Sequence, residues 1–264
     1  MLKPYLYIAK TKILSALAYR FDVISTIVIQ CLVVIATSFF WMAAYGQRQS
    51  AMGVTLNQML TYSIMSSLLS CLLTANVEDR VIQSVRKGNV ALDMLKPVSV
   101  FGMYLAEDIG AIAVAFCQNA LPLLLISCLL IQVPVPSSAV NLLLFIVSLV
   151  FSYLINWLIT ACFSMLSFFV ISIGPLHQTK NVLIRILSGS IIPLWFFPEG
   201  LQTVLKFLPF VCIYQLPLSI YIGKLDWPDI LMQMGLQLIW LLILYAVFKM
   251  IQKKVLSNVL IQGG

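Results

Sequence analysis

The chain has 264 residues, of which 61% are hydrophobic and only 9% are charged. Soluble domains average about 25% charged residues, so a water-facing globule with one buried core is excluded and the solvent must be mostly lipid. No stretch outside the apolar segments reaches the ~50 residues of a small folded domain, so soluble machinery must come from another chain. The formal net charge of +7 does not indicate nucleic-acid binding, because the basic residues flank apolar segments and form no single patch.

Hydropathy along the chain predicts an all-α membrane protein with six transmembrane helices, each near the ~20 apolar residues that cross a bilayer. In chain order, these segments are residues 23–45, 58–75, 101–131, 140–173, 182–197 and 230–251. With the N-terminus in the cytoplasm, thirteen of the sixteen lysines and arginines fall on the inner side. We therefore expect one membrane domain over residues 1–264, in the plasma membrane of a cell, with both termini cytoplasmic.

Two further segments are not simple spans. Residues 1–21 mix lysines with apolar side chains, and we expect an interfacial helix along the inner leaflet, the alternative being a frayed basic tail. Residues 193–228 carry five prolines and yet stay apolar, so they form no single straight helix and are too apolar for an exposed loop. We expect one or two short re-entrant helices at the outer face, buried against protein.

The loop of residues 76–99 is the longest predicted cytoplasmic connection. Residues 78–87 have a helical composition, and Gly88 is a fitting stop signal. Leu92 and Leu95 then give a second short apolar face. Exposed apolar side chains flanked by charges of both signs suit the docking of another protein, whereas a simple tether needs neither the length nor the apolar face.

No residue pattern for catalysis or nucleotide binding is found in the sequence. A GxxxxGK[ST] phosphate loop is absent, and the six cysteines include no CxxC pair. His177 is the only histidine and has no His or Cys companions, so we expect no metal site. We expect no cofactor bound by this chain.

Polar residues inside apolar segments are the remaining functional leads. Glu107 and Asp108 lie about 15 Å along a helix from Pro97, and their possible partners are Arg185, Lys180 or another subunit. The alternative is an interfacial pair that only ends the span. Small side chains suited to a helix interface or a translocation path, and equally to ordinary packing, occur at Ser63, Ser66, Ser67, Ser70, Ser188, Gly189 and Ser190.

Three stretches resemble the membrane subunits of ABC-2 type exporters, in particular the bacterial branch described as ABC-2 family transporter protein. Residues 88–97 read GNVALDMLKP and are similar to the G…LLxKP loop of that branch. Residues 188–198 read SGSIIPLWFFP and are similar to its SG..iPl..fP stretch. The segment from Leu208 to Phe210, with Pro217 and Gly223, resembles the lPf…P…g that follows. The resemblance covers nearly the whole chain and identifies no substrate.

The resemblance implies a permease of the ABC-2, or type V, exporter fold that is not itself an enzyme. It implies pairing with a second copy or a paralogous permease, and with ABC ATPase subunits that bind ATP and Mg. The loop that takes up the force from the ATPase would be formed by Glu78, Asp79, Arg80, Arg86, Lys87, Gly88, Leu92, Leu95, Lys96 and Pro97. An outer gate would be formed by Pro193, Phe197, Pro198, Leu208, Pro209 and Phe210. The path would run mainly along the second and fifth spans.

Three other functions stay open at this point. A secondary transporter driven by an ion gradient usually shows internal repeats or broken helices in both halves, and the two halves here show no matching breaks. An importer or vitamin-uptake subunit would also dock ATPases, but its Ala-Arg-Gly-like coupling run is not present. An assembly or scaffold protein is also compatible with the sequence.

Overall fold

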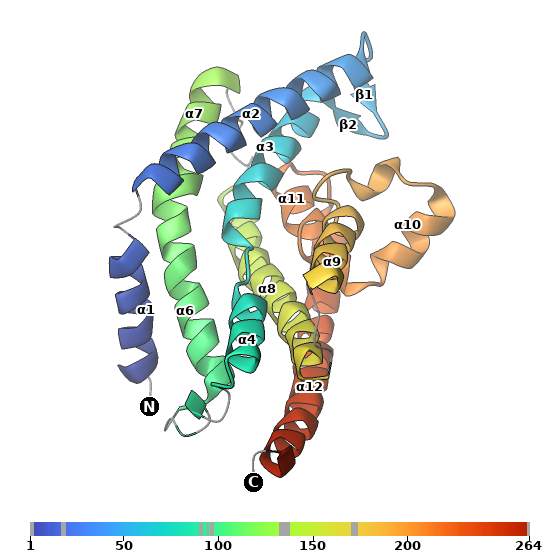
Figure 1. Cartoon of the computed structure of the whole chain (residues 1–264). Helices are drawn as coiled ribbons and strands as arrows, with labels where there is room; N and C mark the ends of the chain where they lie inside the picture. The colour runs from blue at the N-terminus through green and yellow to red at the C-terminus, as the bar shows by residue number, and fades with distance from the viewer. Residues whose placement is uncertain are drawn as a thin grey trace.

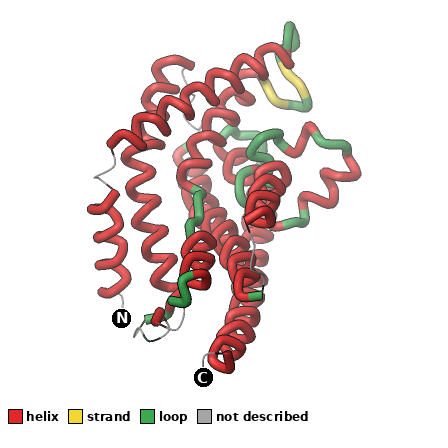
Figure 2. Tube along the Cα trace, in the orientation of Figure 1, coloured by secondary structure: helices red, strands yellow, loops and turns green. Residues whose placement is uncertain are grey.

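The computed structural model is mostly helical and describes residues 3–16, 20–89, 92–93, 95, 98–131, 138–169 and 174–262. The first half contains α1 (Lys3–Ala16), α2 (Arg20–Tyr45), β1 (Ser50–Ala51), β2 (Val54–Thr55), α3 (Leu56–Leu72), α4 (Val77–Arg86), α6 (Val100–Ala115), the π-helical turn η1 (Phe116–Ala120) and α7 (Leu121–Ile131). The second half contains α8 (Ala139–Ser164), η2 (Met165–Phe168), α9 (Gly174–Leu187), η3 (Leu194–Phe196), α10 (Glu199–Lys206), η4 (Pro209–Cys212), α11 (Gln215–Tyr221) and α12 (Trp227–Gln262). Within the described residues, strands are confined to the β1–β2 hairpin (Figure 2).

Five helical stretches in the described part of the chain are long and apolar enough to cross a membrane. They are Val23–Tyr45, Leu56–Arg86, Val100–Cys128, Ala139–Phe168 and Trp227–Val255. Large apolar side chains on α2 and α12 stay exposed, as on helices that face lipid. A multi-pass, all-α membrane protein is therefore confirmed, while the count of six spans stays a prediction.

The predicted span at residues 182–197 is not one continuous helix. α9 ends at Leu187, and the chain turns through Gly189, whose φ is +81°. That backbone conformation is open mainly to glycine. The chain then reaches the 3₁₀ turn η3 and Pro198, which precedes α10. The apolar residues 182–197 are thus divided between the end of α9, a turn and η3, although together they approach the length of a transmembrane helix.

The chain ends and the loop after α4 lie at one end of the molecule, and the β1–β2 hairpin and α10 lie towards the other (Figure 1). The predicted topology, with both termini on the side of residues 76–99, agrees with this arrangement. Which end faces the cytoplasm stays a prediction.

The first segment forms the helix α1, which lies lengthwise beside α6 (Figure 1). The close approach is allowed by Gly110, because a Cβ at that position would meet the carbonyl oxygen of Ala9 at 2.6 Å. Tyr5 contributes a further contact, since its hydroxyl accepts a 3.3 Å hydrogen bond from the amide of Ser99. Hydropathy did not indicate this packing, and the place of α1 relative to the bilayer stays a prediction.

The helix predicted at residues 78–87 is present as α4. Glu78 and Asp79 lie in its first turn and Arg86 in its last, in accordance with the helix dipole. Gly88, at φ +68°, ends it in a Schellman motif: the amide of Asn89 donates to Ser84 O at 2.9 Å and that of Gly88 to Val85 O at 3.1 Å. The glycine stop signal is confirmed.

Candidate functional site

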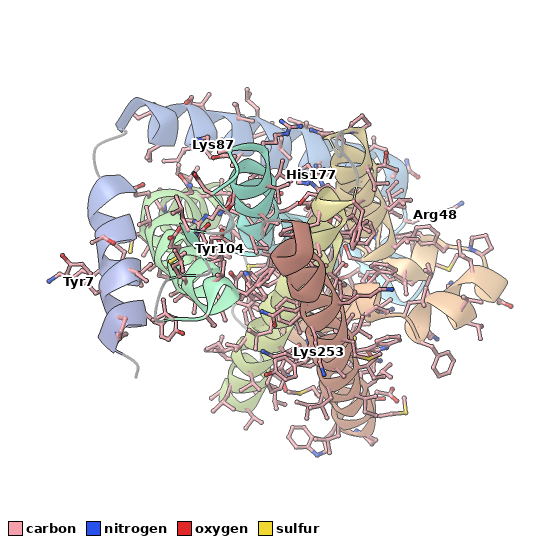
Figure 3. The ribbon with its side chains drawn as sticks, turned by 60° about the horizontal axis from the view of Figure 1, so that its bottom comes forward. Tyr7, Arg48, Lys87, Tyr104, His177 and Lys253 are labelled. Carbon is pink, nitrogen blue, oxygen red and sulfur yellow. The ribbon has the colours of Figure 1, made fainter. Side chains whose placement is uncertain are left out.

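The helix α4 packs against α6 and α8, and its side chains also reach α9. Figure 3 views the molecule from the end that holds α4 and shows Tyr104 of α6 and His177 of α9 on either side of it. The buried residues of α4 are Val77, Glu78 and Val81. A carboxylate is thus part of its inward face, and a carboxylate removed from water needs charged or hydrogen-bonding partners.

Glu78 contacts two basic side chains of α9. The Glu78 side chain is 1% exposed, and its Oε2 forms an ion pair with the buried Lys180. The same oxygen lies 2.7 Å from Nδ1 of His177. Asn181 Nδ2 lies 3.0 Å from Nε2 of that ring, where the donor and acceptor roles depend on the tautomer of the imidazole. One carboxylate therefore joins α4 to α9.

Burial determines the electrostatics of Lys180. Removal from water lowers the pKa of its ammonium group below the ordinary value, and the hydrogen bond and charge of Glu78 oppose that shift. The ring of Phe163, in α8, has its centroid 5.8 Å from Nζ and offers an additional cation–π contact. Without the carboxylate, this cation would be left with little solvation.

A second group of charges joins α4 to α6, and through α6 to α8. Arg80 forms an ion pair with Glu107 through Nη1, and its Nη2 lies 3.5 Å from Oδ1 of Asp108. Asp108 is fully buried, and its Oδ2 accepts a 3.0 Å hydrogen bond from Nε1 of Trp157 in α8. We call the six residues of both groups the α4 charge cluster: Glu78, Arg80, Glu107, Asp108, His177 and Lys180.

The partners predicted for Glu107 and Asp108 within the chain are corrected by this geometry. Both carboxylates pair with Arg80, because α6 packs directly against α4. Lys180 is paired with Glu78 instead. The pair also does more than end a span, since Asp108 is bonded to three different side chains through Arg80, Asn76 and Trp157.

The segment that follows α4 is held to it by Asp93. Ser84 of α4 and Tyr104 of α6 both donate hydrogen bonds to Oδ2 of this carboxylate, at 2.7 and 3.1 Å. Leu92 and Leu95 lie on either side of Asp93 and are 62% and 81% exposed. Two large apolar side chains are thus presented on a segment that is bonded to two helices, as a docking surface requires.

The other residues predicted for coupling divide into two groups. Exposed positions in α4 and the turn after it are Asp79, Arg86, Lys87 and Gly88. Lys96 and Pro97 lie outside the described residues. The coupling role of the whole set stays a prediction.

The two small-residue stretches meet within this chain. Ser66 Oγ donates a 2.7 Å hydrogen bond to Ser190 O, and the Tyr62 hydroxyl donates one of 2.7 Å to Gly189 O. Ser188 is buried beside them. The remaining serines of α3 donate to carbonyls of their own helix, as seen for Ser63, Ser67 and Ser70. The contact joins α3 to the turn after α9, and its role in a path stays a prediction.

The predicted re-entrant segment contains two short helices, α10 and α11, and folds back onto the first half of the chain. Trp195 packs edge-on against Tyr62, with ring centroids 5.3 Å apart, and Phe196 stacks on Trp41 at 5.1 Å. Lys224 Nζ donates a 3.0 Å hydrogen bond to Met52 O, which ties the end of the segment to the β1–β2 hairpin. Of the six gate residues, Pro193 and Pro209 are buried, Phe197, Leu208 and Phe210 are half-buried, and Pro198 is exposed.

A family model described as ABC-2 family transporter protein matches residues 31–263, which is most of the chain. The chain belongs to this family. Comparisons with curated proteins and with solved structures find no match. Membership in the ABC-2 transporter family makes the chain a membrane transport subunit, a permease of ABC transporters, which typically works with ABC ATPases and is generally not catalytic itself.

Sequence reasoning about this ABC-2 chain missed three residues of the site: Asp93, Trp157 and His177. Asp93 is an acidic residue between apolar ones in the loop, and that contrast was a usable signal. Trp157 and His177 gave no such signal, because their partners lie 49 and 99 positions away in the chain. The sequence did not predict a carboxylate partner for His177, although a buried carboxylate is a suitable partner for a histidine.

Proposed function

We propose that this chain is the permease of an ATP-driven exporter and that it forms the translocation path as a homo- or heterodimer. Separate ATPase subunits bind ATP and Mg, and this chain binds no cofactor. The ATPases dock on the exposed end of α4 and on Leu92 and Leu95, which lie in the cytoplasm with both termini. The composition supports this division of labour, because no stretch between the apolar segments reaches the length of a small folded domain.

The observation that carries the proposal is the mechanical connection of α4. Leu92 and Leu95 are exposed, while the segment between them is bonded to α4 and α6 through Asp93. Buried charges join α4 to α6 and α9, and Asp108 of α6 is hydrogen-bonded in turn to Trp157 of α8, on which α4 packs. Closely packed and ion-paired elements move together, so a displacement of α4 is passed on to three further helices.

The route from α4 to the opposite end of the molecule runs through α9. Glu78 and Lys180 connect α4 to α9, and the turn after α9 contacts α3 through Gly189 and Ser190. A shift of α9 therefore alters the α3 contact and the start of the segment at 193–228. We propose that alternating access consists of the opening and closing of a path at the contact of α3 with the turn after α9. Residues 193–228 would form the gate of this path.

The alternative is a secondary transporter driven by an ion gradient. One observation favours it: Glu78 is a buried carboxylate in contact with His177 and Lys180, a set that proton-coupled carriers also use. The two functions differ in the partner they need, because only the exporter requires an ATPase.

Co-purification with the ATPase tests the proposal. We expect the tagged full chain, extracted from its native membranes, to retain an ATP-binding subunit that hydrolyses ATP. Leu92→Asp or Leu95→Asp should lower the retained ATPase about tenfold or more, because a charge is placed in an apolar contact. The matched control is Leu201→Asp, which changes an exposed leucine of α10 towards the opposite end and should retain the ATPase.

A chain that purifies without any ATPase and transports with a proton or sodium gradient alone would reject the exporter. An ATPase that is retained equally by all three variants would leave the exporter standing but would remove Leu92 and Leu95 from the docking surface.

A further inference from the structure

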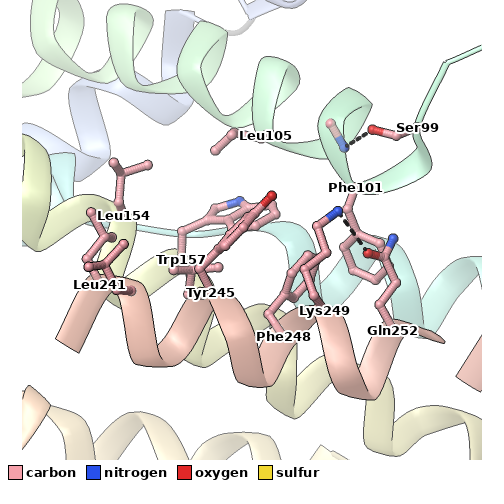
Figure 4. A pocket seen from close by; sticks show the side chains of 13 residues that line it. Ser99, Phe101, Leu105, Leu154, Trp157, Leu241, Tyr245, Phe248, Lys249 and Gln252 are labelled. Carbon is pink, nitrogen blue, oxygen red and sulfur yellow. Dashed lines mark hydrogen bonds between the residues drawn. The ribbon is translucent and has the colours of Figure 1, made fainter. Parts of the chain in front are cut away.

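An apolar groove with a volume of about 360 Å³ lies between α6, α8 and α12, beside the α4 charge cluster (Figure 4). Leu105 comes from α6, Trp157 from α8, and Leu242, Tyr245 and Phe248 from α12. Its size falls in the range of small-molecule sites. On α12, residues about one turn apart, at 241, 245, 248 and 252, line the same groove.

Lys249 is the charged side chain of this groove. Its Nζ lies 3.4 Å from Gln252 Oε1 and 5.6 Å from the ring centroid of Tyr245. Among the described residues, no carboxylate lies within ion-pair distance of it. Lys253 and Lys254 follow within about a turn on α12 and are exposed, but they do not line the groove.

Two other polar side chains of the groove are already bonded. Trp157 Nε1 donates to Asp108, and Ser99 Oγ accepts a 3.1 Å hydrogen bond from the amide of Gly102. An occupant therefore meets apolar walls along its length and, at one end, a cation that has no carboxylate partner in the described part of the chain. A membrane anion with an aliphatic tail has that chemistry, whereas a neutral apolar molecule would leave Lys249 without a counter-ion.

We propose that the groove between α6, α8 and α12 binds an acyl chain of an anionic phospholipid, whose headgroup pairs with Lys249. The lipid covers Trp157, which on its other edge holds Asp108 of the α4 charge cluster. Occupancy therefore supports the packing of α12 and α6 around α8 next to that cluster. This site does not depend on docking of an ATPase.

Native mass spectrometry of the delipidated full chain tests this site. The chain is offered equal amounts of dioleoylphosphatidylglycerol, which is anionic, and dioleoylphosphatidylcholine, which has no net charge. We expect about fivefold or more retention of the anionic lipid over the other, because one lysine near an anionic headgroup has an effect of that size. Lys249→Gln should abolish the preference. The matched control, Lys206→Gln, removes an exposed lysine of α10 and should keep it.

A second pair of variants tests the apolar part of the groove. Leu242→Trp fills it and should lower retention of both lipids, whereas Leu231→Trp, at another exposed leucine of α12 outside the groove, should not. Equal retention of the two lipids by the unmodified chain would overturn the proposal, as would an unchanged preference in Lys249→Gln. A dimer that Leu242→Trp dissociates without any loss of lipid would instead place a second copy of the chain in the groove, and would equally overturn it.

Discussion

Buried charges are concentrated at one place in a chain that has few charges at all. Glu78, Lys180 and Asp108 are each less than 5% exposed, and each has a partner of opposite sign. A buried ion pair is a weak source of net stability, because desolvation offsets most of the attraction. Removal of only one partner has a larger effect, because the other charge is then buried without a partner. The cluster therefore favours one arrangement of α4, α6 and α9 over others more than it adds to total stability.

Glu78→Gln is expected to destabilise the protein by about 3–5 kcal/mol, because Lys180 would stay buried without a carboxylate. The measurement is the unfolding midpoint of the purified chain in detergent. The control is Asp79→Asn, which removes the next carboxylate of α4, an exposed one, and should change stability by less than about 0.5 kcal/mol.

The double variant Glu78→Gln with Lys180→Met separates an unpaired charge from lost packing. It should recover part of the stability lost in the single variant, because no buried charge remains. Equal losses for Glu78→Gln and Asp79→Asn, or a double variant less stable than the single one, would contradict the structural role of the pair.

At the scale of elements, glycines in left-handed conformations set two helix ends that matter here. Gly88 ends α4 and leaves its last turn exposed, where docking is proposed. Gly189 ends α9 and lets the chain turn towards α3 and α11. There the Gln215 Oε1 accepts a 3.0 Å hydrogen bond from the amide of Leu194 and lies 3.0 Å from the Tyr62 hydroxyl. The turn is therefore held by specific bonds.

Gly189→Ala is expected to cost at least about 2 kcal/mol, the sum of a left-handed backbone for alanine and a steric clash. Its Cβ would lie 2.5 Å from Gln215 Oε1 and 3.1 Å from the Tyr62 hydroxyl. Gly200→Ala is the control, because that position in α10 has open space and should change stability by less than about 1 kcal/mol. Unfolding midpoints in detergent measure both. A tolerated Gly189→Ala would show that the turn after α9 adapts.

The sequence was informative where a feature is local. The apolar run at residues 23–45 and the stop at Gly88 both depend on neighbours in the chain, and both were predicted. The end of α9 at Leu187 was missed, because hydropathy averages over Gly189. The pairing of Arg80 with Glu107 was missed for another reason: it depends on how α4 and α6 are rotated about their axes, and no local pattern records that rotation. The groove at Lys249 needs three helices and was likewise not predictable.

On the scale of the whole molecule, the two ends differ in charge and in the parts they present. One end carries both termini and the end of α4, and the other carries the β1–β2 hairpin and α10 (Figure 1). The predicted division of thirteen basic residues on one side against three on the other is an asymmetry that favours a cytoplasmic basic side. The ATPase proposal requires that side to be internal, since ATP is cytoplasmic.

Labelling of single cysteines on intact cells decides the orientation. In a background with the six native cysteines replaced by alanine, Arg48→Cys and Lys206→Cys should react with a membrane-impermeant thiol reagent. Lys87→Cys and Lys253→Cys should react only after the cells are permeabilised, because arginine and lysine are held on the inner side. All four positions are exposed, so a difference in their labelling reports the side of the membrane and not burial within the protein. Reaction of Lys87→Cys in intact cells would place α4 outside the cell, and an ATPase could then not dock on Leu92 and Leu95. Reaction of only Arg48→Cys and Lys206→Cys would place α4 on the cytoplasmic side, where ATP is present.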